Sequence, residues 1–413
     1  MIFASWSLAA ALTLAPAPAD TFRLADAVAL ARAANPMLQA ARLGAAAAAE
    51  RIGPAGTLPD PRLELSFMNR RIGDLGSTME PMTMNQIQAS QVVPWPGKLG
   101  FSRERAEHQA AAAGFDAAEA ERMVVARVRG LYYRAAYVDR AIAIMQRTRT
   151  LLRDFVTVTQ TRYAVGEALQ QDVLQAQVAV ARMTEDLAVM DAERVALASR
   201  LNALLDRPAD QAVDALELPS VTDPILPAEA LMRLARQNRP ALAAADQRAQ
   251  AAQAAIRLAD RERYPDLMLG LQYGGRPRYD NMASLMLGVS VPVWAGRKQN
   301  AMRRESRAME AMARAEALAL ANETFARLAE LAAMAERSRN LAQLYATSIL
   351  PQARAAVEGA LAAYRVGRVD FMSLIENQMT VNRYETERVR LLAAYQTARA
   401  EIDALTEGTG GAP

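Results

Sequence analysis

The chain of 413 residues contains no cysteine and one histidine, His108. The lack of cysteine excludes disulfide bridges, cysteine-based metal sites, cysteine nucleophiles and a lipid anchor on cysteine. One histidine excludes metal sites built from several histidines and disfavours a Ser-His-Asp hydrolase. The net charge of +3 disfavours a dedicated nucleic-acid binder. With no nucleophile–base pair, metal cluster or phosphate loop in view, the sequence predicts no enzyme, no cofactor and no metal site.

Long apolar runs are also missing. Residues 2–14 form a short apolar run, followed by small residues at Ala17 and Ala19 and then by Asp20. The run is too short for a spanning helix, which needs about 20 apolar residues. The small residues fit an A-x-A cleavage site, although no basic residue precedes the run. We predict a signal peptide over residues 1–19; a disordered Ala/Pro tail or a wrong start codon is the alternative.

The second half of the chain echoes the first. Four landmarks recur in the same order, about 200 residues apart. They are Asn-Pro segments at 35–36 and 238–240, Pro-Asp segments at 59–60 and 265–266, Pro/Trp/Gly/Lys segments at 94–98 and 292–298, and Tyr-x-Val-Gly segments at 163–166 and 364–367. Such an internal repeat predicts two halves of one protomer, residues 20–218 and 219–407, rather than separate domains.

Each half has the pattern helix, two strands, long helix, tight turn, helix. Between Lys98 and Tyr163 apolar residues recur at helical steps, and no proline interrupts them. The resulting helix would be roughly 100 Å long, and the stretch 298–364 is equally long, which favours coiled-coil packing. The two shorter segments of each half add up to a similar length, which predicts that they stack end to end. These segments are 36–58 and 168–206, then 240–263 and 369–406.

Four short segments alternate apolar and polar residues, near 62–67, 84–93, 267–273 and 285–291. Alternation alone leaves open a transmembrane β-barrel or a soluble sheet packed on helices. Trp95 and Trp294 follow strand ends, where membrane-interface aromatics occur, and the expected hairpin tips 69–83 and 274–283 are polar. Both features favour strands in outer-membrane lipid. Four strands cannot close a barrel, so two copies with eight strands or three copies with twelve are needed. An eight-stranded barrel is filled by its own side chains, so the polar inner face favours a cyclic trimer around a water-filled pore.

These motifs together resemble the TolC-like outer membrane efflux proteins. The matching residues are Leu58–Pro61, Gln91–Leu99 and the two Tyr-x-Val-Gly turns. The resemblance implies a mainly α fold with a small β part: a homotrimer with a twelve-stranded outer-membrane barrel and a coiled-coil helical barrel in the periplasm. It implies the passive exit duct of a tripartite efflux system. The implied partners are a periplasmic adaptor and an inner-membrane transporter of RND type.

The same resemblance implies roles for the turns. Gly166 and Gly367 would end the long helices at the periplasmic tips, with positive φ. Tyr163, Val165 and Val366 would flank them, and the tips would dock the adaptor. Plain helix-hairpin geometry is the alternative reading of these turns.

A latch at the pore entrance is implied by position from each turn glycine. Asp172 and Tyr364 would form it. Ser373 replaces the family acid nearest the tip, whereas Glu376 keeps the next one, and Arg368 lies beside the position of a family arginine. A carboxylate ring at a pore throat favours cations. A solvated helix-face charge is the alternative for Glu376.

The exported substrate is left open. The Pro-Trp-Pro-Gly-Lys variant is most similar to family members that serve heavy-metal pumps. Several of the 20 methionines fall in or near the strands. Thioethers suit Cu(I), but methionine is also a common apolar filler. A type I secretion duct and a soluble periplasmic coiled-coil spacer are the competing functions.

Overall fold

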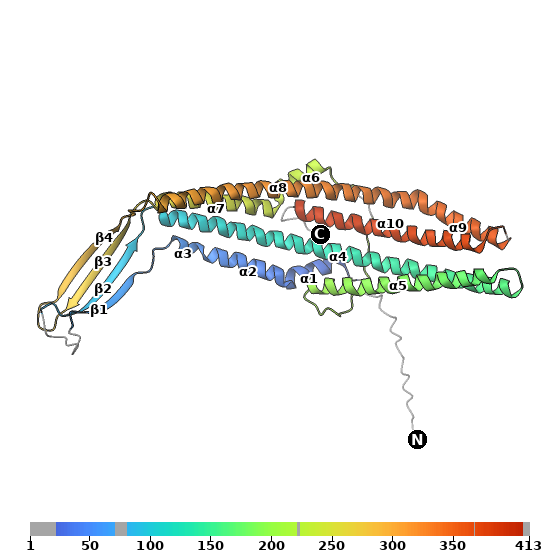
Figure 1. Cartoon of the computed structure of the whole chain (residues 1–413), viewed down its shortest axis with the longest axis horizontal. Helices are drawn as coiled ribbons and strands as arrows, with labels where there is room; N and C mark the ends of the chain where they lie inside the picture. Colours follow the sequence, from blue (N-terminus) through green and yellow to red (C-terminus); the bar gives the residue numbers. More distant parts are fainter. Residues whose placement is uncertain (1–21, 71–80, 221–223, 367, 408–413) are drawn as a thin grey trace, which may run out of the picture.

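The computed structural model describes residues 22–70, 81–220, 224–366 and 368–407. Long helices form most of the molecule, and one sheet lies at one end (Figure 1). The predicted signal peptide lies outside the described residues. The helices are α1 (Leu24–Ala34), α2 (Pro36–Glu50), α3 (Ile52–Gly56), α4 (Lys98–Ala164), α5 (Gln170–Leu204), α6 (Ala228–Asn238), α7 (Pro240–Arg261), α8 (Lys298–Leu344), α9 (Leu350–Arg365) and α10 (Phe371–Thr406), with a π-helical turn η1 (Tyr345–Ile349). The strands are β1 (Arg62–Met68), β2 (Met84–Val93), β3 (Asp266–Gly275) and β4 (Met282–Ser290).

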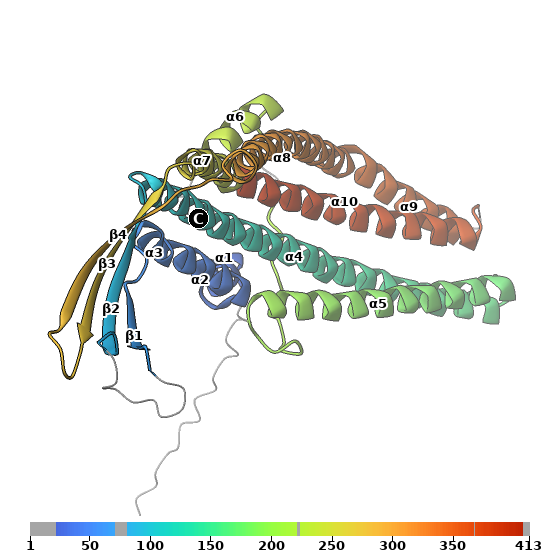
Figure 2. The ribbon, with the colours of Figure 1, turned by 60° about the vertical axis from the view of Figure 1, so that its left-hand side comes forward.

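The helices form columns along the long axis. Helix α4 has 67 residues and runs the whole length of the helical part. It packs against α2 and α5 and against α7 and α10, while α8 packs against α7 and α10. At the end away from the sheet, α4 with α5 and α9 with α10 form two arms (Figure 2). This arrangement confirms that the shorter helices stack end to end beside a long one.

Two asparagines join the stacked helices. The side-chain oxygen of Asn35 accepts from the backbone N–H groups of the first turn of α2, and its amide donates to the carbonyl of Leu204, at 2.8 Å. Asn238 donates in the same way to Thr406, at 2.9 Å. At position 35 asparagine is suited to both contacts, because it caps α2 while it donates to the end of α5.

The second long helix differs from the prediction. A single helix over 298–364 is wrong, because α8 ends at Leu344 and η1 separates it from α9. Pro351 lies in the first turn of α9. Proline has no N–H to donate and its ring crowds the carbonyl four residues earlier, so the backbone widens into a π-turn before it. The chain therefore contains one continuous and one interrupted long helix.

The sheet is antiparallel with strand order β1-β2-β3-β4, so the β2–β3 pairing joins the two halves. Its register separates two faces. One cross-strand row is apolar and consists of Leu63, Ala89, Leu271 and Leu285; the next row is polar and consists of Glu64, Gln88, Gln272 and Ser284. The second hairpin tip is shorter than predicted, since β3 extends to Gly275 and β4 begins at Met282.

The apolar face of the sheet is exposed, and Leu285 retains 73% of its accessible surface. The buried core lies instead between the helices, in three clusters. One packs α1 on α4, one joins α4, α5, α9 and α10 near the tips, and one packs α6 on α8 and α10. Among the described residues, no helix is both long and apolar enough to span a membrane.

Candidate functional site

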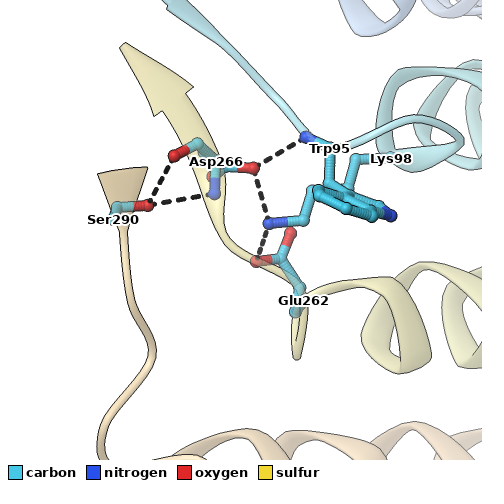
Figure 3. Close-up of polar contacts among 5 residues, drawn as sticks. All are labelled: Trp95, Lys98, Glu262, Asp266 and Ser290. Carbon is cyan, nitrogen blue, oxygen red and sulfur yellow. Dashed lines mark hydrogen bonds and ion pairs between the residues drawn. The ribbon is translucent and has the colours of Figure 1, made fainter. Parts of the chain in front are cut away.

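A buried lysine lies where the sheet meets the helices. Lys98, the first residue of α4, is only 6% exposed. Its ammonium group lies 2.8 Å from Oδ1 of Asp266 and 3.4 Å from Oε2 of Glu262 (Figure 3). The same Asp266 oxygen accepts from the backbone N–H of Trp95, and the Asp266 N–H donates to the hydroxyl of Ser290. This cluster ties α4, the end of α7, and strands β3 and β4 together, so we call it the junction.

Lys98 and Asp266 belong to two of the repeated sequence motifs, at 94–98 and 265–266, but these motifs alone predict no role for either residue. One signal was present: Lys98 and Lys298 are the only lysines, and each opens a long helix. The partner could not be read from the sequence, because Asp266 lies in the other half. The sequence also missed Glu262.

The two predicted interface tryptophans have different surroundings. The Trp95 ring stacks on Tyr264, with centroids 5.3 Å apart and an interplanar angle of 12°. Trp294 is 71% exposed. Both follow strand ends, as predicted, and their role at a membrane interface stays a prediction.

The turn between α4 and α5 has the hydrogen bonds of a Schellman motif. Gly166 has a φ of 78°, its N–H donates to Tyr163, and the next N–H donates to Arg162. Positive φ is what glycine supplies at such a helix end. Val165 and Val366 are exposed at the two tips, and Tyr163 is half-exposed. Gly367 lies outside the described residues.

The proposed latch residues lie near the same tips. Tyr364 is buried; its ring packs against Phe371, and the guanidinium of Arg162 lies 4.8 Å from the ring centroid. Arg162 also donates to the Tyr364 carbonyl, at 3.0 Å. Burial raises the pKa of Tyr364; the charge of Arg162 opposes this shift, and the charge of Asp172 adds to it. The Asp172 carboxylate accepts from the N–H of Leu169, and no hydrogen bond joins it to Tyr364 among the described residues.

The remaining entrance residues are exposed. Arg368 and Glu376 make no ion pair among the described residues. Ser373, which stands at the position of the missing acid, hydrogen-bonds through its hydroxyl to Asp370, the N-cap of α10. The entrance roles of these residues stay predictions, and Arg162 is a neighbour that sequence reasoning missed.

Methionines occupy the polar face of the sheet. The register places all strand methionines there: Met68, Met84, Met268, Met282 and Met286. Three of them cover glycines, because a Cβ on Gly270, Gly274 or Gly288 would contact a methionine side chain. Among the described residues, no group of three or more His, Cys, Asp or Glu is placed to hold a metal ion.

The fold is that of solved outer membrane channels. VceC from Vibrio cholerae has a TM-score of 0.79 and 18% identity, covering 93% of this chain and 96% of that chain. The open-state MtrE channel of Neisseria gonorrhoeae has a TM-score of 0.79 and 16% identity, covering 94% of this chain and 89% of that chain. CusC has a TM-score of 0.80 and 15% identity, covering 96% of each chain. At these identities the likeness establishes the fold alone, and no curated protein matches.

The chain belongs to the outer membrane efflux protein family, which it matches over residues 27–206 and 231–408. The resemblance to TolC-like proteins and the mainly helical fold with a small sheet are thereby confirmed. The protein is therefore an outer membrane efflux channel.

Proposed function

We propose that three copies of the chain form the passive exit duct of a tripartite efflux system. Their strands close a twelve-stranded barrel in the outer membrane, with the apolar face toward lipid and the polar face toward the pore. Their helices form a periplasmic tunnel. Exposed leucines on one face of an antiparallel sheet and polar residues on the other support this arrangement.

The observation that carries the proposal is a junction that, in the part of the chain that the structure describes, is complete at only one of two equivalent positions. Among the described residues, β1 and β4 each have one unpaired edge. Lys298 opens α8 as Lys98 opens α4, and Asp60 precedes β1 as Asp266 begins β3. Yet Lys298 and Asp60 are exposed and have no ion pair among the described residues. Pairing β4 with β1 of a second copy brings that copy's Asp60 to Lys298 and repeats the junction.

The tryptophans support the same pairing. Trp95 stacks on Tyr264, which stands two residues before Asp266. Leu58 stands two residues before Asp60 and is exposed, as is Trp294. In the assembled barrel, Trp294 covers Leu58 of the neighbouring copy. The exposed apolar surface of a single chain is thereby buried at each interface between copies.

The tips at the other end provide the docking surface for a periplasmic adaptor. Val165, Val366 and Tyr163 supply exposed apolar side chains there. The adaptor links the duct to an inner-membrane transporter of RND type, which provides the energy. Asp172, Tyr364 and Arg162 hold the entrance closed. A heavy-metal cation as cargo stays a prediction from the Pro-Trp-Pro-Gly-Lys motif.

Crosslinking tests the assembly, because the native chain has no cysteine. The double variant Lys298→Cys with Asp60→Cys, treated with a short thiol-reactive crosslinker in outer-membrane fractions, should give a covalent trimer on a denaturing gel. The pair Lys98→Cys with Asp60→Cys is the control and should remain monomeric, since Lys98 already contacts its own chain. A heat-labile soluble monomer would instead support the periplasmic spacer.

A further inference from the structure

A groove of about 800 Å³ crosses the middle of the helical part. Its lining comes from α5, α4, α10 and α8 and from Arg239, between α6 and α7, so it lies on the broad face of the chain and not at a lateral edge. The floor of the groove is largely apolar and includes Gly130, Leu131, Leu204 and Leu320.

On α4, the groove lies on the side away from α1. Val125 and Tyr132 of α4 belong to the cluster that packs on α1. At about 100° per residue, Arg127 and Arg134, which line the groove, lie on nearly the opposite side of α4. In the proposed trimer we place α1, which packs on α4, on the outside of the tunnel wall. In the proposed trimer the groove therefore faces the bore.

Two arginines in this groove lack a counter-charge. Arg134 of α4 pairs with Glu193 of α5, at 2.9 Å. One heptad further along both antiparallel helices, the corresponding residues are Arg127 and Arg200. Both line the groove, and neither has an ion pair or hydrogen bond among the described residues. The antiparallel pair α4–α5 therefore has an ion pair at one position and two arginines at the position seven residues further along each helix.

The other charges of the groove do not neutralise them. Arg327 of α8 pairs with Glu330 and Glu401. Arg239 pairs with Glu119, at 2.9 Å. Glu323 is the one lining carboxylate without an ion pair among the described residues, and it belongs to α8, which does not pack on α5. The α4–α5 side of the groove therefore carries an unbalanced positive charge beside apolar surface.

We propose that this groove binds small organic anions with an apolar body, such as aromatic carboxylates or sulfonates, on their way through the duct. Guanidinium groups bind carboxylate and sulfonate oxygens through paired, charge-assisted hydrogen bonds. The apolar floor accommodates the ring, and a mostly apolar site with a few placed polar groups is typical of small-molecule pockets. The exposure of the groove to the bore rests on the proposed function, whereas binding to the purified protein does not.

Two probes with the same ring test the proposal on the purified full-length protein in nanodiscs. They are 1-naphthalenesulfonate and 1-naphthylmethylammonium, whose binding is followed by ring fluorescence. The anion should bind at least about tenfold more tightly than the cation, because only the anion pairs with the arginines. Replacing Arg127→Gln or Arg200→Gln should weaken anion binding by about tenfold each.

Two further variants keep the test independent of folding. Arg127→Glu places a carboxylate opposite Arg200, which gives the Arg134–Glu193 pairing with the two charges exchanged between the helices, so it should abolish the anion preference without loss of stability. Arg233→Gln, on the exposed side of α6, removes the same charge outside the groove and should change nothing. Equal binding of both probes, or anion binding that survives Arg127→Glu, overturns the proposal.

Planar-bilayer recording separates this proposal from the proposed function. A conducting pore that the anion blocks in the native protein but not in the Arg127→Glu variant supports both. A conducting pore without anion block overturns the groove alone. Absence of any pore overturns the duct, and the fluorescence measurement then still decides the groove.

Discussion

Lys98 and Asp266 lie 168 residues apart in the chain, and their side chains meet at 2.8 Å. The contact joins the first turn of the longest helix to a strand from the other half. Lys98 is buried, whereas the carboxylates of Asp266 and Glu262 keep 29% and 36% of their exposure. One ammonium group therefore forms ion pairs with two partly solvated carboxylates at the point where the sheet is attached to the helices.

Removing that ammonium group should destabilise the protein. Replacing Lys98→Ala leaves both carboxylates without their cation. We expect a loss of about 2 kcal/mol, less than for a fully buried pair because both acids reach solvent. Urea titration followed by circular dichroism measures it. Arg103→Ala removes an exposed pair with Glu107 in the same helix and should cost no more than about 0.5 kcal/mol. Equal losses in the two variants would show that the junction adds no special stability.

The tip glycine should not tolerate a side chain. Gly166 has a φ of 78°, so Gly166→Ala should destabilise the α4–α5 turn by about 1 kcal/mol. Gly114 lies within α4 with open space around its Cα, and Gly114→Ala should stabilise the helix by up to about 1 kcal/mol. Opposite signs in the same unfolding assay confirm the prediction. A neutral Gly166→Ala would mean that the turn is set by something other than backbone strain.

A partly buried carboxyl near the end of α10, that of Asp403, should make stability depend on pH. Burial, with help from the charge of Glu407, raises the pKa of Asp403 to about 6, although Arg129 lies 3.3 Å away and lowers it. The folded protein then binds a proton more tightly than the unfolded chain. The contribution of Asp403 to the free energy of unfolding is complete below the ordinary aspartate pKa, and it is lost as the pH rises through 6.

Replacing Asp403→Asn should flatten this profile. The variant should be more stable than the native protein at pH 7, by about 2 kcal/mol, and nearly equal to it at pH 4. Unfolding measured across this range gives the two slopes. Parallel profiles would show that Asp403 does not titrate in the way that its burial implies.

The predicted latch could depend on the hydroxyl of Tyr364 or on its ring, and three variants distinguish these two explanations. Tyr364→Ala removes the ring that packs on Phe371 and lies under Arg162, and it should raise single-channel conductance in planar bilayers. Tyr364→Phe removes the hydroxyl alone. If Asp172 holds the entrance through that hydroxyl in the trimer, Tyr364→Phe and Asp172→Asn should raise conductance equally. If only Tyr364→Ala has an effect, packing closes the entrance. Unchanged conductance in all three would remove the latch.

Much of the fold could be predicted because it depends on local periodicity. Steps of three and four residues place α4 to within one residue of its end. The weaker alternation between 84 and 93 still places β2 at its observed bounds. The interruption at η1 was missed although Pro351 lies inside the expected helix, because the apolar periodicity continues on both sides of it. The partners of Lys98 were missed because ion pairing between distant segments leaves no local trace. Arg127 and Arg200 become informative only when α4 and α5 are known to be antiparallel neighbours.

The sheet register constrains how such a chain can change in length. Through all four strands, residues of the polar face pair only with residues of the polar face. Deleting or inserting one residue inside a strand would turn every later side chain of that strand to the other face, exchanging leucines with glutamines and serines. The same change in a hairpin tip leaves both faces intact. Length variation in this protein is therefore free at the tips and forbidden between them, except in steps of two.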